Sequence, residues 1–109
     1  MRVRVSAVYE QAKEILCMKY VYGGIEVYAL PGGGVDKDVP FHDAVKDEWK
    51  EELGVKIEVG DVIMMGEAPG DKRHPQTLHV IFWCTEVHGT PKIRRSEEHT
   101  SELQSPVVI

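Results

Sequence analysis

Most of the chain alternates apolar and polar residues, and one segment in its middle has a helical period instead. Alternation predicts half-buried strands, whereas apolar residues every three to four positions predict a helix. These patterns predict strands at 2–9, 14–21, 26–30, 55–59, 62–65 and 77–87. The last strand is mostly apolar, which favours a central place in a sheet.

Glycines and prolines mark where these elements end. Gly23–Gly24 predicts a hairpin-like turn, and residues 31–34, Pro-Gly-Gly-Gly, are expected to break any regular element. The helical period runs from Pro40, which suits a helix start, to Gly54, which suits a helix end. Residues 68–76 are expected to form a loop. Together the predicted strands and the helix indicate one mixed α/β (α+β) domain, a sheet with at least one helix packed on it.

The predicted helix carries both an apolar stripe and an acidic group. At about 100° per residue, Phe41, Val45 and Trp49 share one stripe with Ala44 beside them. The opposite side carries charged residues that are expected to face solvent: Asp43, Lys46, Asp47 and Lys50.

Three glutamates on this helix are spaced so that they project as neighbours. Glu48 and Glu52 fall in the sector of the apolar stripe, and Glu51 lies beside them. Two carboxylates about 5 Å apart repel by roughly 3 kcal/mol at an effective dielectric of 20. Protonation or a hard divalent cation such as Mg²⁺ relieves that repulsion. On the helix alone, a solvated acidic face is an equally open interpretation.

The residues around the glutamates resemble the box of the Nudix hydrolase family, G-x5-E-x7-R-E-U-x-E-E-x-G-U, where U is bulky and apolar. The match starts at Gly33, ends at Gly54 and Val55, and needs no insertion or deletion. The preceding Leu-Pro-Gly-Gly-Gly at 30–34 and Ala44 within the helix are also typical of the family. Two specified positions differ, because Val39 stands where the family has Glu and Asp47 where it has Arg.

The resemblance implies an α/β/α sandwich with a mixed sheet and Mg²⁺-dependent hydrolysis of a nucleoside diphosphate linked to another group, with Mn²⁺ as an alternative ion. It implies Glu48, Glu51 and Glu52 as metal ligands and catalytic residues, with the Gly32 carbonyl as a further ligand. Gly33 supplies the close turn, and Gly33 and Gly54 are the structural glycines of the box. The partner is a small nucleotide, and a homodimer is left open.

The paired losses at Val39 and Asp47 leave an alternative open, a catalytically impaired Nudix-like domain that binds a nucleotide without hydrolysing it. The substrate is not fixed by the sequence. Arg2, Arg4, Tyr9 and His79 are candidates to face a nucleotide pocket, and an ordinary surface or sheet position is the favoured alternative for each. For Trp49 and Trp83, apolar neighbours favour core packing over base stacking.

Bulk properties exclude several other classes of protein. The 109 residues suit one small domain, and 42% apolar with 28% charged residues is an ordinary globular composition. A net charge of −5 without a basic block argues against a nucleic-acid polymer or a membrane as partner. The N-terminus reads as a strand and not as a signal peptide, which predicts a cytoplasmic location. Cys17 and Cys84 lie in apolar runs, so buried reduced thiols are favoured over a disulfide.

The end of the chain has a different character. Residues 95–105 read RSEEHTSELQS, which resembles the in-frame translation of a sequencing-library adapter; a polar helix capped by Ser96 is the alternative. We therefore expect an incomplete Nudix domain at 1–94 and a non-native tail at 95–109. An inert fragment with exposed apolar sheet surface is the third interpretation.

Overall fold

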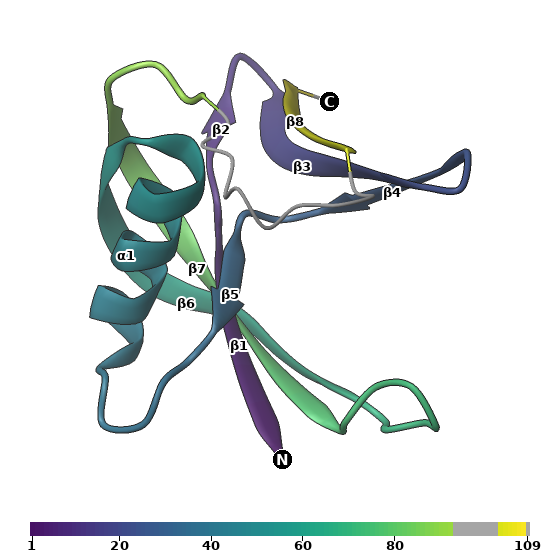
Figure 1. The fold of residues 1–109 in the computed structure, drawn as a ribbon. Coiled ribbons are helices and arrows are strands. Elements are labelled where there is room, and N and C mark those ends of the chain that lie inside the picture. The colour runs from purple at the N-terminus through teal and green to yellow at the C-terminus, as the bar shows by residue number, and fades with distance from the viewer. Residues whose placement is uncertain (93–102, 109) are drawn as a thin grey trace.

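A four-stranded mixed sheet with one helix on its face organises the molecule (Figure 1). The computed structural model describes residues 1–92 and the backbone of 103–108. The sheet has the order β5-β1-β7-β6, where β1 is Arg2–Val8, β5 is Gly32–Gly34, β6 is Lys56–Ala68 and β7 is Thr77–His88. Strands β1 and β7 are parallel, and the other two pairs are antiparallel. The predicted mixed sheet is confirmed, with β7 inside it.

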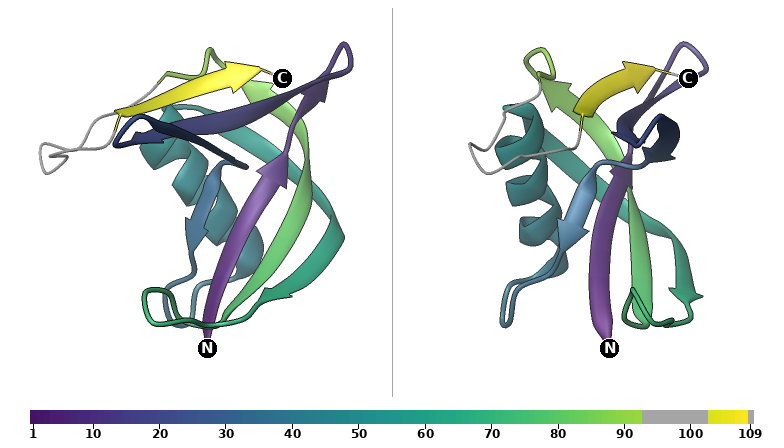
Figure 2. Two further views of the ribbon diagram at one scale, coloured as in Figure 1. Left: turned by 90° about the vertical axis from the view of Figure 1, so that its right-hand side faces the viewer. Right: turned by 45° about the vertical axis from the view of Figure 1, so that its right-hand side comes forward.

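A second, smaller sheet projects from one end of the first, as the two turned views show (Figure 2). It contains β2 (Glu10–Gln11), β3 (Glu14–Tyr22) and β4 (Ile25–Ala29), and β8 (Leu103–Val108) pairs with β3. The turn at Gly23–Gly24 joins β3 and β4 as predicted, and both glycines have positive φ. The short strand β2 was not predicted. The polar helix considered for 95–105 falls largely outside the described residues.

Helix α1 (Phe41–Leu53) covers one face of the mixed sheet. Its buried residues, Ala44, Val45, Trp49 and Leu53, pack on Val5, Ala7, Val80 and Phe82 of the sheet. Gly54 ends the helix in the left-handed conformation, with φ 70°, and its N–H donates to the Lys50 carbonyl at 3.0 Å. Phe41 does not join the apolar stripe as predicted and is 40% exposed. It is the first helical residue, at the end of the stripe.

The glycine segment corrects one prediction. Regular structure breaks at residues 30–31, between β4 and β5, but the glycines do not extend that break, because Gly32–Gly34 forms strand β5 against β1, with Gly33 opposite Val5. A Cβ at Gly32 would overlap the Val5 carbonyl oxygen and lie 2.6 Å from Ser6 Cα. The missing side chain therefore allows the close pairing that the sequence interpretation took for a break.

Strand β6 corrects a second prediction. The strands expected at 55–59 and 62–65 are one strand, Lys56–Ala68, whose pairing with β7 shifts register between Glu58 and Met64. Gly60–Asp61 is absorbed in these irregularities and does not form a turn, as β-bulges insert residues without ending a strand.

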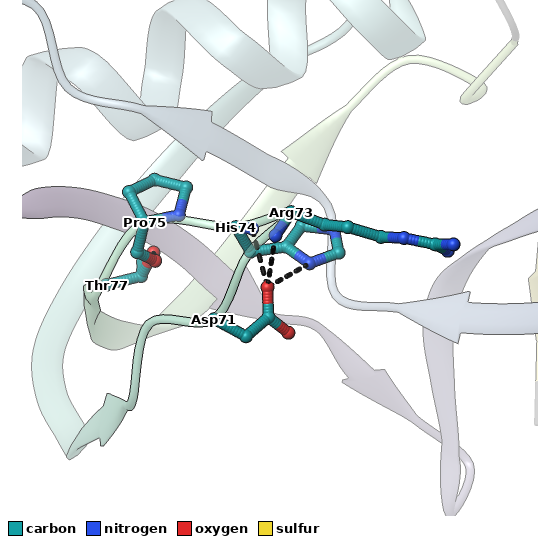
Figure 3. A network of polar contacts seen from close by, with 5 residues as sticks. All are labelled: Asp71, Arg73, His74, Pro75 and Thr77. Atoms are coloured by element: carbon teal, nitrogen blue, oxygen red, sulfur yellow. Dashed lines mark hydrogen bonds and ion pairs between the residues drawn. The ribbon is translucent and has the colours of Figure 1, made fainter.

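The loop between β6 and β7, predicted at 68–76, is held by one carboxylate (Figure 3). One oxygen of Asp71 accepts the backbone N–H groups of Arg73 and His74, each at 2.7 Å, and lies 3.4 Å from His74 Nδ1. The two backbone bonds lower the Asp71 pKa. This Asx-type turn gives the loop a defined backbone.

Exposed apolar side chains gather on β6, which is an edge strand of the sheet among the described residues. Met64 and Met65 are 61% and 60% exposed, and Val62 and Ile63 are also exposed. Trp83 on the neighbouring strand is 41% exposed, so its predicted place in the core is wrong. An open apolar edge of this kind favours association.

We therefore expect the chain to self-associate as its concentration rises, and Met64→Lys to weaken this association at least about tenfold. A lysine on an edge strand opposes strand pairing, because pairing would bury its charge. Sedimentation velocity over a concentration series measures the effect. Met1→Lys adds the same charge away from the edge. An equal effect of both substitutions, or a monomer at every concentration, would contradict the prediction.

Candidate active site

The acidic helix face and the glycine strand meet at one groove. The groove has a volume of about 630 Å³ and is lined by residues of both sheets and of α1. Its walls come from six elements: Arg2 and Arg4 from β1, Tyr20 and Tyr22 from β3, Val27 and Ala29 from β4, Gly32–Gly34 of β5, Glu48 and Glu52 from α1, and His79 from β7. Most of the residues singled out in the sequence therefore lie together.

Trp49 connects the helix to Pro31, the residue before the glycine strand. Its buried Nε1–H donates to the Pro31 carbonyl at 3.0 Å, and the Ala7 N–H donates to the same oxygen at 3.2 Å. A buried donor left without its acceptor costs about 1–3 kcal/mol, so this bond holds α1 in register with β5. The predicted packing role of Trp49 is confirmed, and the bond fixes where the following residues of the helix point.

Glu48 lies directly against the backbone of Gly33. A Cβ at Gly33 would overlap Cδ of Glu48 and lie 2.5 and 2.7 Å from its two carboxylate oxygens. Position 33 therefore accepts only glycine while Glu48 keeps this place. Burial, and then the charge of Glu51, raise the pKa of Glu48.

Glu52 is the more confined carboxylate of the pair. Its Oε2 is buried and has no hydrogen-bond partner. Burial, and secondly the charge of Glu48, raise the pKa of Glu52 to about 7, against the opposing effect of Arg4. Both half-buried glutamates lie on the core side of the helix, as their spacing predicted.

Glu51 takes a different position from the other two glutamates. It is exposed and is not among the residues that line the groove. Within residues 1–92, no group of three or more His, Cys, Asp or Glu side chains is arranged to hold a metal ion. The three-glutamate ligand set and the Gly32 carbonyl ligand therefore stay predictions. The pair that the structure brings together is Glu48 with Glu52.

The donor chemistry of the pair still fits a hard divalent cation. Such ions prefer carboxylate and carbonyl oxygens, and they usually keep several waters. A buried carboxylate oxygen without a partner is a group that a cation or a proton would satisfy. Glu48 and Glu52 would hold the ion, and the exposed Glu51 would have to reach it by a change of rotamer or through water.

The raised pKa of Glu52 predicts a pH-dependent stability. The unfolded chain releases this proton near pH 4.5 and the folded protein near pH 7, so stability falls as pH rises through that window. We expect Glu52→Gln, which carries no charge, to melt at least about 4 °C above the unsubstituted protein at pH 8 in EDTA. The difference should vanish at pH 4.5. Thermal melts across this pH range measure it, and a pH-independent difference would contradict the assignment.

The two departures from the family box lie outside the groove. Val39 is partly buried and packs against the hydrophobic core. Asp47 is exposed and lies beside Lys46, Lys50 and Lys56 on the solvent side of the helix. Because the Glu and the Arg of the family box are both absent, neither Val39 nor Asp47 leaves an unpaired charged partner in the groove.

Among the predicted pocket residues, Arg2, Arg4 and His79 line the groove, and Tyr9 does not. Tyr9 packs against the core, and its hydroxyl lies 3.4 Å from Gln11. Sequence interpretation missed Tyr20 and Tyr22, whose rings stack with centroids 6.0 Å apart and planes 14° apart. Their i, i+2 spacing on a predicted strand was the available signal, since it places both on one face.

The described residues also answer two smaller questions. Cys17 and Cys84 are free and buried, as favoured, and burial raises the pKa of the Cys84 thiol to about 11. Among the helices of the described residues, none is long and apolar enough to span a bilayer.

The fold and the site define an α/β enzyme domain with an acidic helix beside a glycine-rich strand. A family model described as the NUDIX domain matches residues 1–106, so the chain belongs to the NUDIX family and is a hydrolase of that family. A comparison with curated proteins found no match.

Solved structures of this family share the fold. The E. coli ORF135 protein is 21% identical with a TM-score of 0.75, over 96% of this chain and 73% of its own. A MutT NUDIX hydrolase from Burkholderia pseudomallei is 23% identical with a TM-score of 0.78, over 95% and 81%. An ADP-ribose pyrophosphatase from Streptococcus suis is 19% identical with a TM-score of 0.59, over 95% and 72%. The mixed α/β prediction is thus confirmed, although the described residues contain only one helix layer.

Proposed function

We propose that this chain hydrolyses the diphosphate linkage of a nucleoside diphosphate joined to another group, as a cytoplasmic enzyme that uses Mg²⁺ or Mn²⁺. The observation that carries the proposal is the pair of carboxylates, Glu48 and Glu52, half-buried in a groove that also holds Arg2, Arg4 and His79. Acidic and basic groups in one groove suit a phosphate ligand that is bound partly through a cation.

The proposed reaction adds water to one phosphorus and breaks the bridging P–O bond, which releases a nucleotide and the phosphorylated second group. Glu48 and Glu52 would hold the divalent ion, which would supply charge neutralisation at the phosphate oxygens and a lower pKa for bound water. Without a bound cation, burial raises the pKa of Glu52 to about 7, and a cation beside it would favour the ionised carboxylate that can act as ligand or base. We propose that one of these glutamates accepts the proton of the attacking water.

The rest of the groove supports a nucleotide as the ligand. Arg2 and His79 lie on β1 and β7, where they can meet phosphate oxygens. The stacked pair Tyr20 and Tyr22 also lines the groove, and aromatic faces stack on nucleobases. Among the similar structures are proteins named ADP-ribose pyrophosphatase and UDP-X diphosphatase. These names guide the choice of substrates to test.

The test is release of nucleotide or phosphate from a panel of sugar nucleotides, dinucleoside polyphosphates and nucleoside triphosphates, with Mg²⁺ and with EDTA. Circular dichroism first establishes that the protein is folded. Product that forms with Mg²⁺ and not with EDTA supports hydrolysis and identifies the substrate class. Nucleotide binding by folded protein without product would overturn hydrolysis in favour of the impaired binding domain.

A further inference from the structure

The hairpin formed by β3 and β4 has a different chemistry on each of its two faces. Residues directly opposite each other in an antiparallel pair share a face. On one face, Lys19 lies 3.1 Å from Glu26, and the Glu26 carboxylate also accepts the Tyr28 hydroxyl at 3.0 Å. These polar groups contact one another, and none of the three residues lines the groove.

The other face of the hairpin is aromatic and apolar, and it lines the groove. Tyr20 lies opposite Val27, and Tyr22 follows two residues later on the same face of β3. Both tyrosines, Val27 and Ala29 are groove residues. Tyr20 packs against the hydrophobic core, whereas Tyr22 is 44% exposed. This groove face of the hairpin therefore runs outward from the core and ends at an accessible ring.

The two tyrosine rings lie in nearly the same orientation. Their centroids are 6.0 Å apart and their planes differ by 14°. Because the Tyr20 ring is packed against the core, its contact with Tyr22 restrains the plane of the outer ring. A restrained side chain loses little further freedom when a ligand binds to it. The groove face is therefore prepared for a flat ring.

The described groove residues offer few side chains that read the edge of a base. Asparagine and glutamine suit the adenine edge, but neither type is among them, and the chain contains no asparagine. Arginine suits guanine, but the Arg4 guanidinium donates to the Leu30 carbonyl. Stacking without edge contacts accepts every base, since each has a π-face.

We propose that the groove face of the hairpin binds the nucleobase by stacking on Tyr22, and that it favours purine over pyrimidine nucleotides without distinguishing adenine from guanine. Tyr20 holds the plane of the Tyr22 ring. A purine has two fused rings, so it covers more of the tyrosine than a pyrimidine does and removes more apolar area from water. The inference rests on the proposed function in taking the groove as the nucleotide site. It concerns binding alone, so it can fail separately from hydrolysis.

Binding of analogues that resist hydrolysis provides the test. The ligands are nucleoside diphosphates with a methylene group in place of the bridging oxygen, carrying adenine, guanine, cytosine or uracil. Methylenediphosphonate is the control without a base. Isothermal titration calorimetry with excess Mg²⁺ measures each dissociation constant. We expect the two purine analogues to bind within about twofold of each other and at least about threefold more tightly than the pyrimidine analogues.

Three substitutions separate stacking on Tyr22 from general effects on the hairpin. Tyr22→Val keeps a good strand former without the ring, and it should weaken purine binding at least about fivefold and remove the purine preference. Tyr22→Phe keeps the ring and should bind within about twofold of the unsubstituted protein. Tyr28→Val removes a tyrosine of similar exposure, 46%, from the other face and should change nothing. Circular dichroism checks folding, and Tyr22→Leu replaces Tyr22→Val if that variant does not fold.

Methylenediphosphonate, which has no ring, should bind all of these proteins equally. Its loss in Tyr22→Val, or equal losses of purine binding in Tyr22→Val and Tyr28→Val, would assign Tyr22 to the structure of the hairpin and overturn the inference. So would pyrimidine binding as tight as purine binding, a tenfold preference between the two purines, or no saturable nucleotide binding by the folded protein. Purine binding that depends on Tyr22, without product from the substrate panel, would overturn only hydrolysis.

Discussion

Gly33→Ala is expected to lower turnover about 100-fold while the protein remains folded. The new methyl group would overlap the Glu48 carboxyl group, so the side chain must move away from β5. A misplacement of about 1 Å at a reacting centre can cost 100-fold in rate. The strand itself tolerates alanine, because Gly33 does not have a positive φ. Steady-state kinetics with the substrate found in the panel, together with a thermal melt, measure the effect.

Gly34→Ala is the matched control for Gly33→Ala. A Cβ at Gly34 would meet only the Arg2 guanidinium, at 3.2 Å and beyond, and the end of that side chain can move. We expect less than a fivefold loss in turnover, with the change mainly in KM. Similar losses for both variants would mean that strand β5, and not Glu48, is what the added methyl disturbs.

Glu52→Gln is expected to lower turnover at least about 100-fold, although it stabilises the metal-free protein at high pH. The substitution keeps the size of the side chain, removes its negative charge and replaces one carboxylate oxygen with an NH2 group that does not ligate a cation. Losses in the second coordination shell alone reduce metal affinity or activity by about 10–100-fold. A loss of activity combined with a gain of stability is the signature of a site held under electrostatic strain.

Glu51→Gln separates the two interpretations of the acidic triple. Because Glu51 is exposed and outside the groove, its loss should reduce turnover less than that of Glu52. An equal loss would return Glu51 to the ligand set that the family resemblance implies. Unchanged turnover in Glu52→Gln would instead remove Glu52 from the reaction.

The helix and its acidic face were predictable from sequence because both follow from spacing. The helical period of the apolar residues, with Pro40 and Gly54 as end signals, located α1. A helical wheel placed Glu48 and Glu52 on the core side. Such regularities are local, so no knowledge of partners is needed to recognise them. The box motif then connected the helix to the glycine segment before the structure brought the two together.

What sequence could not provide depends on partners far along the chain. Gly32–Gly34 becomes a strand only because β1 offers a close backbone, and β6 continues through Gly60 only because β7 pairs with both sides of it. Tyr20 enters the groove through the way the two sheets meet. The exposure of Glu51 likewise depends on the packing of α1, since helical spacing alone makes it a neighbour of Glu48.

The central claim, that Glu48 and Glu52 form a divalent-metal site, is tested most directly by Mn²⁺ titration of the folded protein at pH 8. Electron paramagnetic resonance measures the free ion, so no substrate is needed. We predict one saturable site in the unsubstituted protein and at least about tenfold weaker binding in Glu52→Gln. Equal binding by both proteins, or no saturable site in either, would contradict the account.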